Sequence, residues 1–173
     1  SMKTKKLILC SLFAALTAVC SMVSIPLPFT PVPINLATLS VFLAGGLLGS
    51  KGGAVSQGVY VVLGAVGLPV FHSFTSGLGI LTGPTGGYII GYVAAAWLTG
   101  FIIEKLGHGF VKNAAAMIAG LAACYALGTA WFMNITSTGP AAALMMCVVP
   151  FLIGDALKII AGSFLVTRLK KLI

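Results

Sequence analysis

Residues 141–167 read AAALMMCVVPFLIGDALKIIAGSFLVT, an apolar run in which the charged residues are Asp155 and Lys158. An α-helix needs roughly 20 mainly apolar residues to cross the hydrocarbon core of a bilayer, and this run is longer than that. Pro150 and Gly154 within the run predict a tilt or a kink. We therefore predict a transmembrane helix that carries two buried charges.

The composition of the whole chain agrees with this reading. Its 173 residues are 59% hydrophobic and 7% charged, whereas soluble domains carry about a quarter charged residues. A net charge of +8 on a soluble protein would suggest a nucleic-acid partner, but this chain has no polar surface to carry a basic patch. The composition therefore excludes a soluble or disordered protein and predicts an all-α integral membrane protein without nucleic acid.

The apolar runs predict six spans in one domain that covers residues 1–173. Glycines cluster around the turn Ser50–Lys51 between the second and third runs, and this favours a hairpin of two short helices over one kinked helix. The predicted spans are 7–24, 35–49, 52–68, 85–104, 114–134 and 141–167.

The basic residues predict the orientation. Apart from Lys158, they all fall at the two chain ends or in the loops that six alternating helices place on one side. Because Lys and Arg concentrate on the cytoplasmic side, both termini are predicted to be cytoplasmic in a multi-pass protein of the bacterial cell membrane. The residues concerned are Lys3, Lys5, Lys6, Lys51, Lys105, Lys112, Arg168, Lys170 and Lys171.

Two loops on the opposite side carry no charged residue. Residues 25–34 read IPLPFTPVPI and residues 69–84 read PVFHSFTSGLGILTGP. Long apolar loops are rarely left in water and often cover a functional site. We favour a lid formed by both loops; the alternative is that they simply pack on the helix ends.

Asp155 and Lys158 are the strongest candidates for function. Charged residues deep in a span are costly, so they face the bundle interior and have a partner. Their spacing places them on one helical face. They could merely neutralise each other, but we favour a binding role, because together they present an acceptor and a donor to a polar ligand with N–H and C=O groups. Glu104, next to Lys105 at a span end, is predicted to be solvated.

Motifs for other chemistry are missing. GSKGG at 49–53 lacks phosphate-loop spacing, and GLGILTG at 77–83 does not fit GxGxxG. The four cysteines show no CxxC spacing, and the few acidic and histidine residues form no evident acid–base pair or metal cluster. The sequence therefore predicts a binding protein, not an enzyme, with no cofactor and no metal.

Four segments of the chain stand out as a set: TGPTGGYIIGY at 82–92, VPINLATLSVFLAGGLLG at 32–49, GAVGLPVF at 64–71 and GDALK at 154–158. Together they resemble the BioY family, the biotin-specific S components of energy-coupling-factor (ECF) transporters. The resemblance implies six helices and biotin bound near the outer face under the two apolar loops. It also implies a membrane-embedded coupling subunit and two ATPase subunits as partners.

Biotin suits the two buried charges, because its ureido ring has two N–H donors and one carbonyl acceptor. Asp155 can accept from an N–H and Lys158 can donate to the carbonyl. Tyr88 and the glycine-rich segment around Gly87 can form an apolar wall. Thr75 stands where family members often carry Asn or Ser, which makes it a candidate contact.

The chain departs from the family pattern in two places. Ala37 precedes Thr38 where the family commonly has Gln, and Ile89 stands where some members have Arg. The biotin carboxylate is therefore left with His72 as the evident cation on the outer side. Otherwise backbone and hydroxyl donors, such as those of Ser73, receive it, or it points to solvent.

The coupling subunit of such transporters meets an Ala-x-x-x-Ala motif on the first helix, which Ala14 and Ala18 match. Small residues at this spacing also let helices pack within one chain, so both interpretations stay open. The functional alternatives are an S component for another small vitamin, or a stand-alone secondary vitamin transporter in which Asp155 relays protons.

Overall fold

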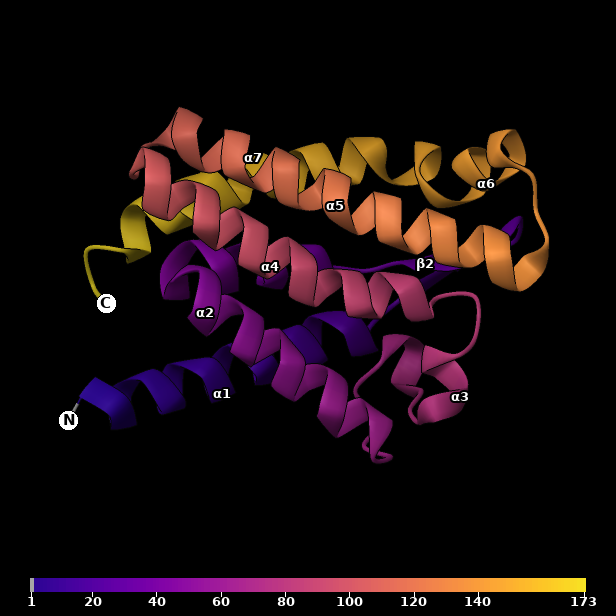
Figure 1. Ribbon diagram of the computed structural model, residues 1–173, viewed down its shortest axis with the longest axis horizontal. Coiled ribbons are helices and arrows are strands. Elements are labelled where there is room, and N and C mark those ends of the chain that lie inside the picture. The colour runs from indigo at the N-terminus through magenta and orange to yellow at the C-terminus, as the bar shows by residue number, and fades with distance from the viewer. Residues whose placement is uncertain (1) are drawn as a thin grey trace.

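The computed structural model describes residues 2–173, with side chains from residue 3 onward, and forms an elongated helical bundle (Figure 1). Its long helices are α1 (Met2–Met22), α2 (Ala37–Ala65), α4 (Gly86–Leu106), α5 (Phe110–Thr136) and α7 (Leu152–Leu169). Shorter elements are α3 (Leu78–Leu81), α6 (Pro140–Cys147), the 3₁₀ turns η1 (His72–Phe74) and η2 (Val149–Phe151), and the strands β1 (Ile25–Leu27) and β2 (Thr30–Ile34).

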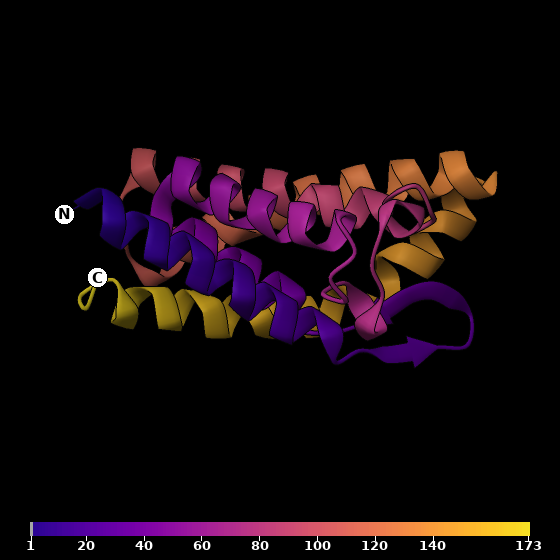
Figure 2. The same ribbon diagram turned by 90° about the horizontal axis from the view of Figure 1, so that it is seen from below.

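The described residues contain five helical segments long and apolar enough to cross a membrane. The expected multi-span helical architecture is therefore present, but the predicted spans 35–49 and 52–68 fall within one continuous element, α2. The count of six spans and the cytoplasmic side of the termini stay predictions. Figures 1 and 2 show both termini at one end of the bundle, with the β-hairpin, α3 and α6 at the other.

Helix α2 reverses direction at Gly49. This residue has φ 82° and ψ −176°, a conformation that glycine adopts readily and L side chains rarely adopt. A Cβ atom built on Gly53 would lie 2.9 Å from the Cα atom of Gly45, although eight residues of straight helix span about 12 Å. The predicted hairpin is thus present as a reversal inside α2, and its two halves meet through glycines.

Side chains from two other helices hold this reversal. The Ser50 backbone N–H donates to Glu104 Oε1 over 2.7 Å, and the Ser50 hydroxyl lies 3.0 Å from each carboxylate oxygen. Lys170 Nζ donates to the Leu47 carbonyl over 3.1 Å. The Glu104 carboxylate lies at the N-terminus of the second half of α2, and the Lys170 ammonium lies at the C-terminus of the first half. Both charges interact favourably with the helix dipole. Glu104 is exposed, as predicted, but it is also a helix cap.

The last predicted span is interrupted. Helix α6 ends at Cys147, the turn η2 contains Pro150, and α7 begins at Leu152. Proline has no N–H for a helical hydrogen bond. The sequence predicted a tilt or a kink at Pro150, and the structure shows an interruption of the helix there, while Gly154 lies within α7.

The proline-rich loop forms an antiparallel hairpin that the sequence did not predict. Ile25 pairs with Ile34 and Leu27 with Thr30. A sheet of two strands has only edges, where proline is tolerated. The loop is therefore ordered by backbone pairing.

The small-residue pairs pack inside the chain. Ala14 and Ala18 are 1% and 8% exposed and belong to the core. In this chain both alanines pack against neighbouring helices, and their contact with a coupling subunit stays a prediction. The Cβ positions of Gly45 and Gly91 would likewise meet α4 and α5, at the Ala96 carbonyl (2.4 Å) and Cys124 Sγ (3.2 Å).

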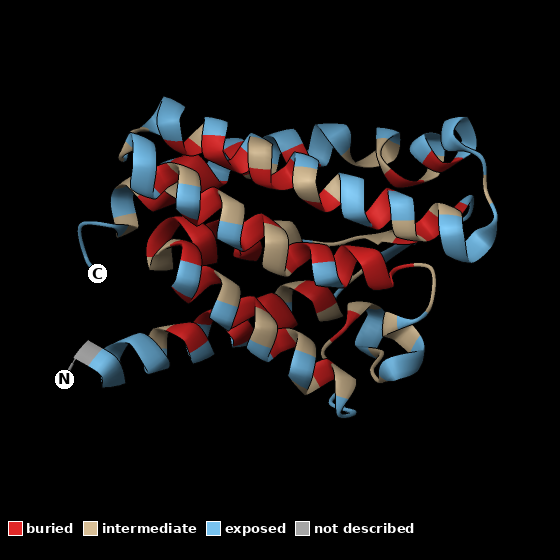
Figure 3. Ribbon diagram, viewed as in Figure 1, coloured by how far each residue is buried: buried red, intermediate tan, exposed pale blue. Residues whose placement is uncertain are grey.

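Buried residues line the inward faces of the helices, whereas exposed residues lie on the outside of the bundle (Figure 3). Many of the exposed side chains are large and apolar, such as Ile153 at 80% and Leu7 at 66%. Such an outer surface suits lipid and does not suit water.

Candidate binding pocket

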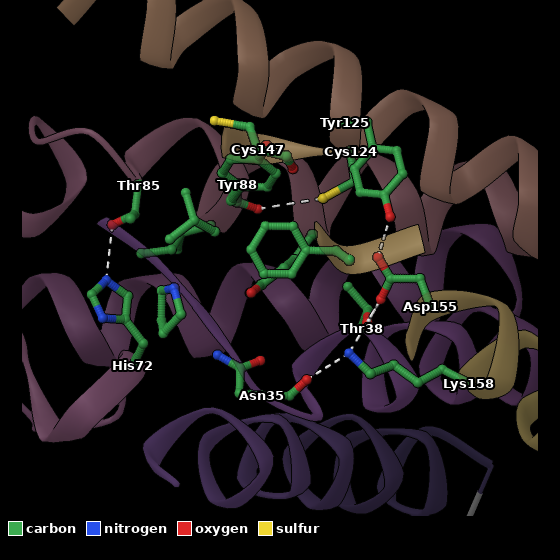
Figure 4. Close-up of a pocket in the computed structure, with 15 residues that line it drawn as sticks. Asn35, Thr38, His72, Thr85, Tyr88, Cys124, Tyr125, Cys147, Asp155 and Lys158 are labelled. Carbon is green, nitrogen blue, oxygen red and sulfur yellow. Dashed lines mark hydrogen bonds and ion pairs between the residues drawn. The ribbon is translucent and has the colours of Figure 1, made fainter. Parts of the chain in front are cut away.

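A cavity of about 50 Å³ lies among α2, α4, α5 and α7, where β2 and η1 meet the helices (Figure 4). Aromatic, aliphatic and sulfur-containing side chains surround a smaller number of polar ones. The polar lining residues, counting the tyrosines, are Asn35, Thr38, His72, Thr85, Tyr88, Tyr92, Tyr125, Asp155 and Lys158; the others are Val32, Pro33, Ile89, Cys124, Cys147 and Phe151.

Asp155 is the central polar group of the pocket and is 3% exposed. Its Oδ1 atom accepts a hydrogen bond from Thr38 Oγ1 over 3.2 Å and an ion pair from Lys158 Nζ over 3.2 Å. The Tyr125 hydroxyl donates to Oδ2. An ionised carboxylate accepts about four hydrogen bonds, so these three partners leave about one acceptor position.

Lys158 connects Asp155 to the segment just before α2. Its ammonium donates to the Asn35 carbonyl over 2.5 Å and to Asp155. Its side chain is 14% exposed. An ammonium has three N–H donors, which leaves one for a ligand. The pair therefore offers one acceptor and one donor side by side, on a single face of α7.

The wall beside the pair is aromatic. The Tyr88 hydroxyl donates to the Cys147 carbonyl over 2.8 Å and lies 3.3 Å from Thr129 Oγ1. Tyr92 and Phe151 also line the cavity. Because its hydroxyl is held by these partners, Tyr88 presents its ring to the cavity as an apolar surface.

The opposite end of the pocket holds a second, weaker polar site. His72 Nε2 lies 2.9 Å from Thr85 Oγ1, at the start of α4. Burial lowers the pKa of the His72 imidazole below its ordinary value of 6.5, so at neutral pH the ring is uncharged. Figure 4 shows His72 and Thr85 on one side and Asp155 and Lys158 on the other.

Both apolar outer loops reach the cavity. The first contributes Val32 and Pro33, and the second contributes His72. Thr75 Oγ1 donates to the His72 carbonyl over 2.6 Å and so fastens the turn that carries the imidazole. Both loops therefore contribute to the lining of the pocket, and their action as a lid stays a prediction.

The structure brings together Asp155, Lys158 and Tyr88 from the sequence candidates. Thr75 lies behind His72 and does not line the cavity, and Ser73 is exposed in a left-handed turn (φ 55°). Gly87 faces α5, because a Cβ atom there would lie 2.4 Å from Trp131 Cβ. These three residues are thus placed outside the lining.

The sequence did not assign three polar contacts to the charged pair. Thr38 and the Asn35 carbonyl come from the start of α2, and Tyr125 comes from α5, 30 positions before Asp155. Tyrosine and threonine are common in membrane helices, so only the packing of α2 and α5 against α7 identifies these partners. No group of three metal-ligating side chains was found among the described residues.

Comparisons with known proteins agree with this architecture. Residues 1–173 match the model of the BioY family. The biotin transporter BioY of Thermotoga maritima is 39% identical over 168 residues, which span 97% of each chain. The probable biotin transporter BioY of Pyrococcus horikoshii is 37% identical over 169 residues, 98% of each chain.

Among solved structures, a crystal structure of the S-component for biotin from an ECF-type ABC transporter matches with a TM-score of 0.91 at 30% identity. The match covers 98% of this chain and 93% of that chain. These relatives are named as transporters, not enzymes. With five long apolar helices, the chain is a multi-pass membrane protein that belongs to the BioY family.

Proposed function

We propose that this chain is a biotin-binding S component that captures biotin outside the cell for an ECF-type importer. The names of the relatives support biotin as the substrate. The observation that carries the proposal is the buried Asp155–Lys158 pair, which keeps one acceptor and one donor for a ligand in a pocket walled by aromatic rings.

The ureido ring matches this arrangement. One ring N–H donates to the remaining acceptor position of Asp155, and the ring carbonyl accepts from the remaining N–H of Lys158. The second ring N–H needs another acceptor. Thr38 Oγ1 supplies one, because it donates to Asp155 and keeps its own lone pairs.

The rest of biotin fits the remainder of the pocket. The thiophane ring and the valeryl chain pack against Tyr88, Tyr92 and Phe151. The carboxylate then lies toward His72 and Thr85, at the far end of the cavity. With Ile89 in place of arginine, this end supplies hydrogen-bond donors and no permanent positive charge.

Binding requires the loops to move. The cavity of about 50 Å³ is far smaller than the roughly 300 Å³ at the lower end of small-molecule sites. The hairpin β1–β2 and the segment around η1 cover it with few residues each, whereas the helices behind it are packed into the core. We therefore place the opening movement in these two loops.

Transport needs an energy source that this chain does not contain. The sequence has no phosphate-binding loop, so we propose a membrane coupling subunit and two ATPase subunits as partners. The Ala14–Ala18 motif on α1 is the proposed contact for the coupling subunit, and both alanines are packed in this chain, at 1% and 8% exposure.

Calorimetry with the purified chain tests the substrate. We expect biotin to bind with submicromolar affinity and thiamine and riboflavin not to compete. A biotin dissociation constant above micromolar would overturn the proposal, and stronger binding of thiamine or riboflavin would favour an S component for that vitamin.

Uptake by liposomes tests the partners. Liposomes that contain the chain, the coupling subunit and the ATPases should accumulate biotin only with ATP, and the subunits should copurify. Accumulation by the chain alone, driven by a proton gradient, would instead establish a secondary transporter.

A further inference from the structure

The end of the molecule away from the binding pocket contains a second cavity, of about 340 Å³, between α1 and the second half of α2. Its lining residues fall into two chemical classes. Three are lysines, namely Lys3, Lys6 and Lys51, and the others are Leu7, Cys10, Gly52 and Val55. The cavity therefore combines a cluster of positive charges with an apolar floor.

These lysines have no carboxylate to neutralise them among the described side chains. Among the described side chains, the salt bridge joins Lys158 and Asp155, which line the binding pocket and not this groove. The Glu104 carboxylate lies next to Ser50, the neighbour of Lys51 in the sequence, but its hydrogen bonds are to the Ser50 backbone N–H and hydroxyl. Three ammonium groups around one groove repel one another, so an anionic ligand would stabilise the arrangement.

The apolar floor extends from this cluster along the outer face of the bundle. Leu7 and Val55 are 66% and 52% exposed. Gly52 lies beside Lys6, since a Cβ atom built there would be in ordinary van der Waals contact with Lys6 Cε, at 3.8 Å. Lys3, Lys6 and Leu7 belong to the first turns of α1, which begins at the end of the bundle where both termini lie (Figure 2).

We propose that this groove, formed by Lys3, Lys6, Lys51, Leu7 and Val55, binds an anionic phospholipid. The phosphate lies among the ammonium groups, and an acyl chain lies along the apolar floor. Charge complementarity identifies this occupant, because cytoplasmic leaflets are rich in anionic lipid and basic pockets beside membrane helices recognise such headgroups. The site is separate from the biotin pocket and does not depend on its function.

Native mass spectrometry of the purified chain with phosphatidylglycerol or phosphatidylcholine tests the site. The variant K6Q/K51Q removes two charges from the groove. The matched control K112Q/K171Q removes two charges from other exposed positions near the same membrane surface. With about 1 kcal/mol per lysine, K6Q/K51Q should weaken phosphatidylglycerol binding about 30-fold, whereas the control should bind as the wild type does.

Equal losses in both double variants, or no loss in K6Q/K51Q, would overturn the site. Melting temperature and biotin binding, measured on the same samples, establish that each variant is folded; if K6Q/K51Q is not, the single variants K6Q and K51Q take its place. A last experiment adds sn-glycerol 3-phosphate, which has the phosphate but no acyl chain, as a competitor of phosphatidylglycerol. We expect it to compete poorly, and competition as strong as that of the whole lipid would show that the apolar floor is not used.

Discussion

The chain has two acidic residues, and the structure uses them in opposite ways. Asp155 is 3% exposed and lies inside the bundle with a lysine and two hydroxyl groups around it. Glu104 is exposed at the other end and caps the helical half that begins at Ser50. The carboxyl group is the same, so burial and remaining hydrogen-bonding capacity decide its role. An enclosed carboxylate with a free acceptor position suits a ligand, and an exposed one that binds a backbone N–H stabilises a turn.

Neutralising Asp155 should have the largest effect on binding. Asp155→Asn keeps the shape of the side chain but leaves Lys158 without its counter-ion and removes the acceptor for the ureido N–H. We expect biotin affinity to fall by about 2–5 kcal/mol, measured by calorimetry. Glu104→Gln is the matched control, and it should bind biotin as the wild type does. Unchanged affinity in Asp155→Asn would remove this residue from the site.

A side chain at Gly49 should destabilise the reversal of α2. Gly49→Ala places a Cβ atom at φ 82°, 2.7 Å from Glu104 Oε1, which we expect to cost about 1–2 kcal/mol. The melting temperature in detergent measures this. Gly58→Ala serves as the control, since nothing lies within 4 Å of its Cβ position, and its melting temperature should be unchanged or higher. Equal behaviour of the two variants would contradict a strained turn.

Removal of the cap should have a smaller effect. Glu104→Ala leaves the Ser50 N–H to water, and loss of an N-terminal cap costs about 1 kcal/mol. We expect a lower melting temperature with unchanged biotin affinity, the opposite pattern to Asp155→Asn. If Glu104→Ala instead weakened biotin binding at unchanged stability, the division between the two carboxylates would be wrong.

The smallest effect concerns His72. Its pKa lies below 6.5 in the free protein because of burial, and a bound carboxylate would raise that pKa. Since protonation and biotin binding then favour each other, affinity should rise as the pH falls from 7.5 toward 5.5. Calorimetry should show this rise in affinity when biotin binds to the wild type. The rise should be absent when biotin methyl ester replaces biotin, and also when the variant His72→Gln replaces the wild type. The same pH dependence with the ester would place the carboxylate away from His72.

The sequence was sufficient to find the class of the protein and the centre of its pocket. Apolar runs predict membrane helices because a bilayer imposes one length and one chemistry. Two charges in one such run identify Asp155 and Lys158, because buried charges are costly unless they are used. Pro150 likewise predicts an irregularity in the last span, because proline removes its own backbone N–H, although the structure shows a break between α6 and α7 where a tilt or a kink was predicted.

The other contacts depend on which helices become neighbours. Thr38 and Tyr125 reach Asp155 only after α2 and α5 pack against α7. Ala14 and Ala18 have the spacing of a small-residue motif, and the orientation of α1 in the bundle packs both into the core. Gly87 and Thr75 belong to segments that support the pocket, and spacing along the chain does not distinguish support from contact.

The sequence by itself thus determined that this protein lies in a membrane and that Asp155 and Lys158 are its central polar pair, because hydrophobicity and the cost of a buried charge are local properties of a segment. Only the tertiary structure decided that Glu104 caps a turn, that two alanines are buried and that Tyr125 supports the pair. Those roles follow from distances between helices, which no single segment contains.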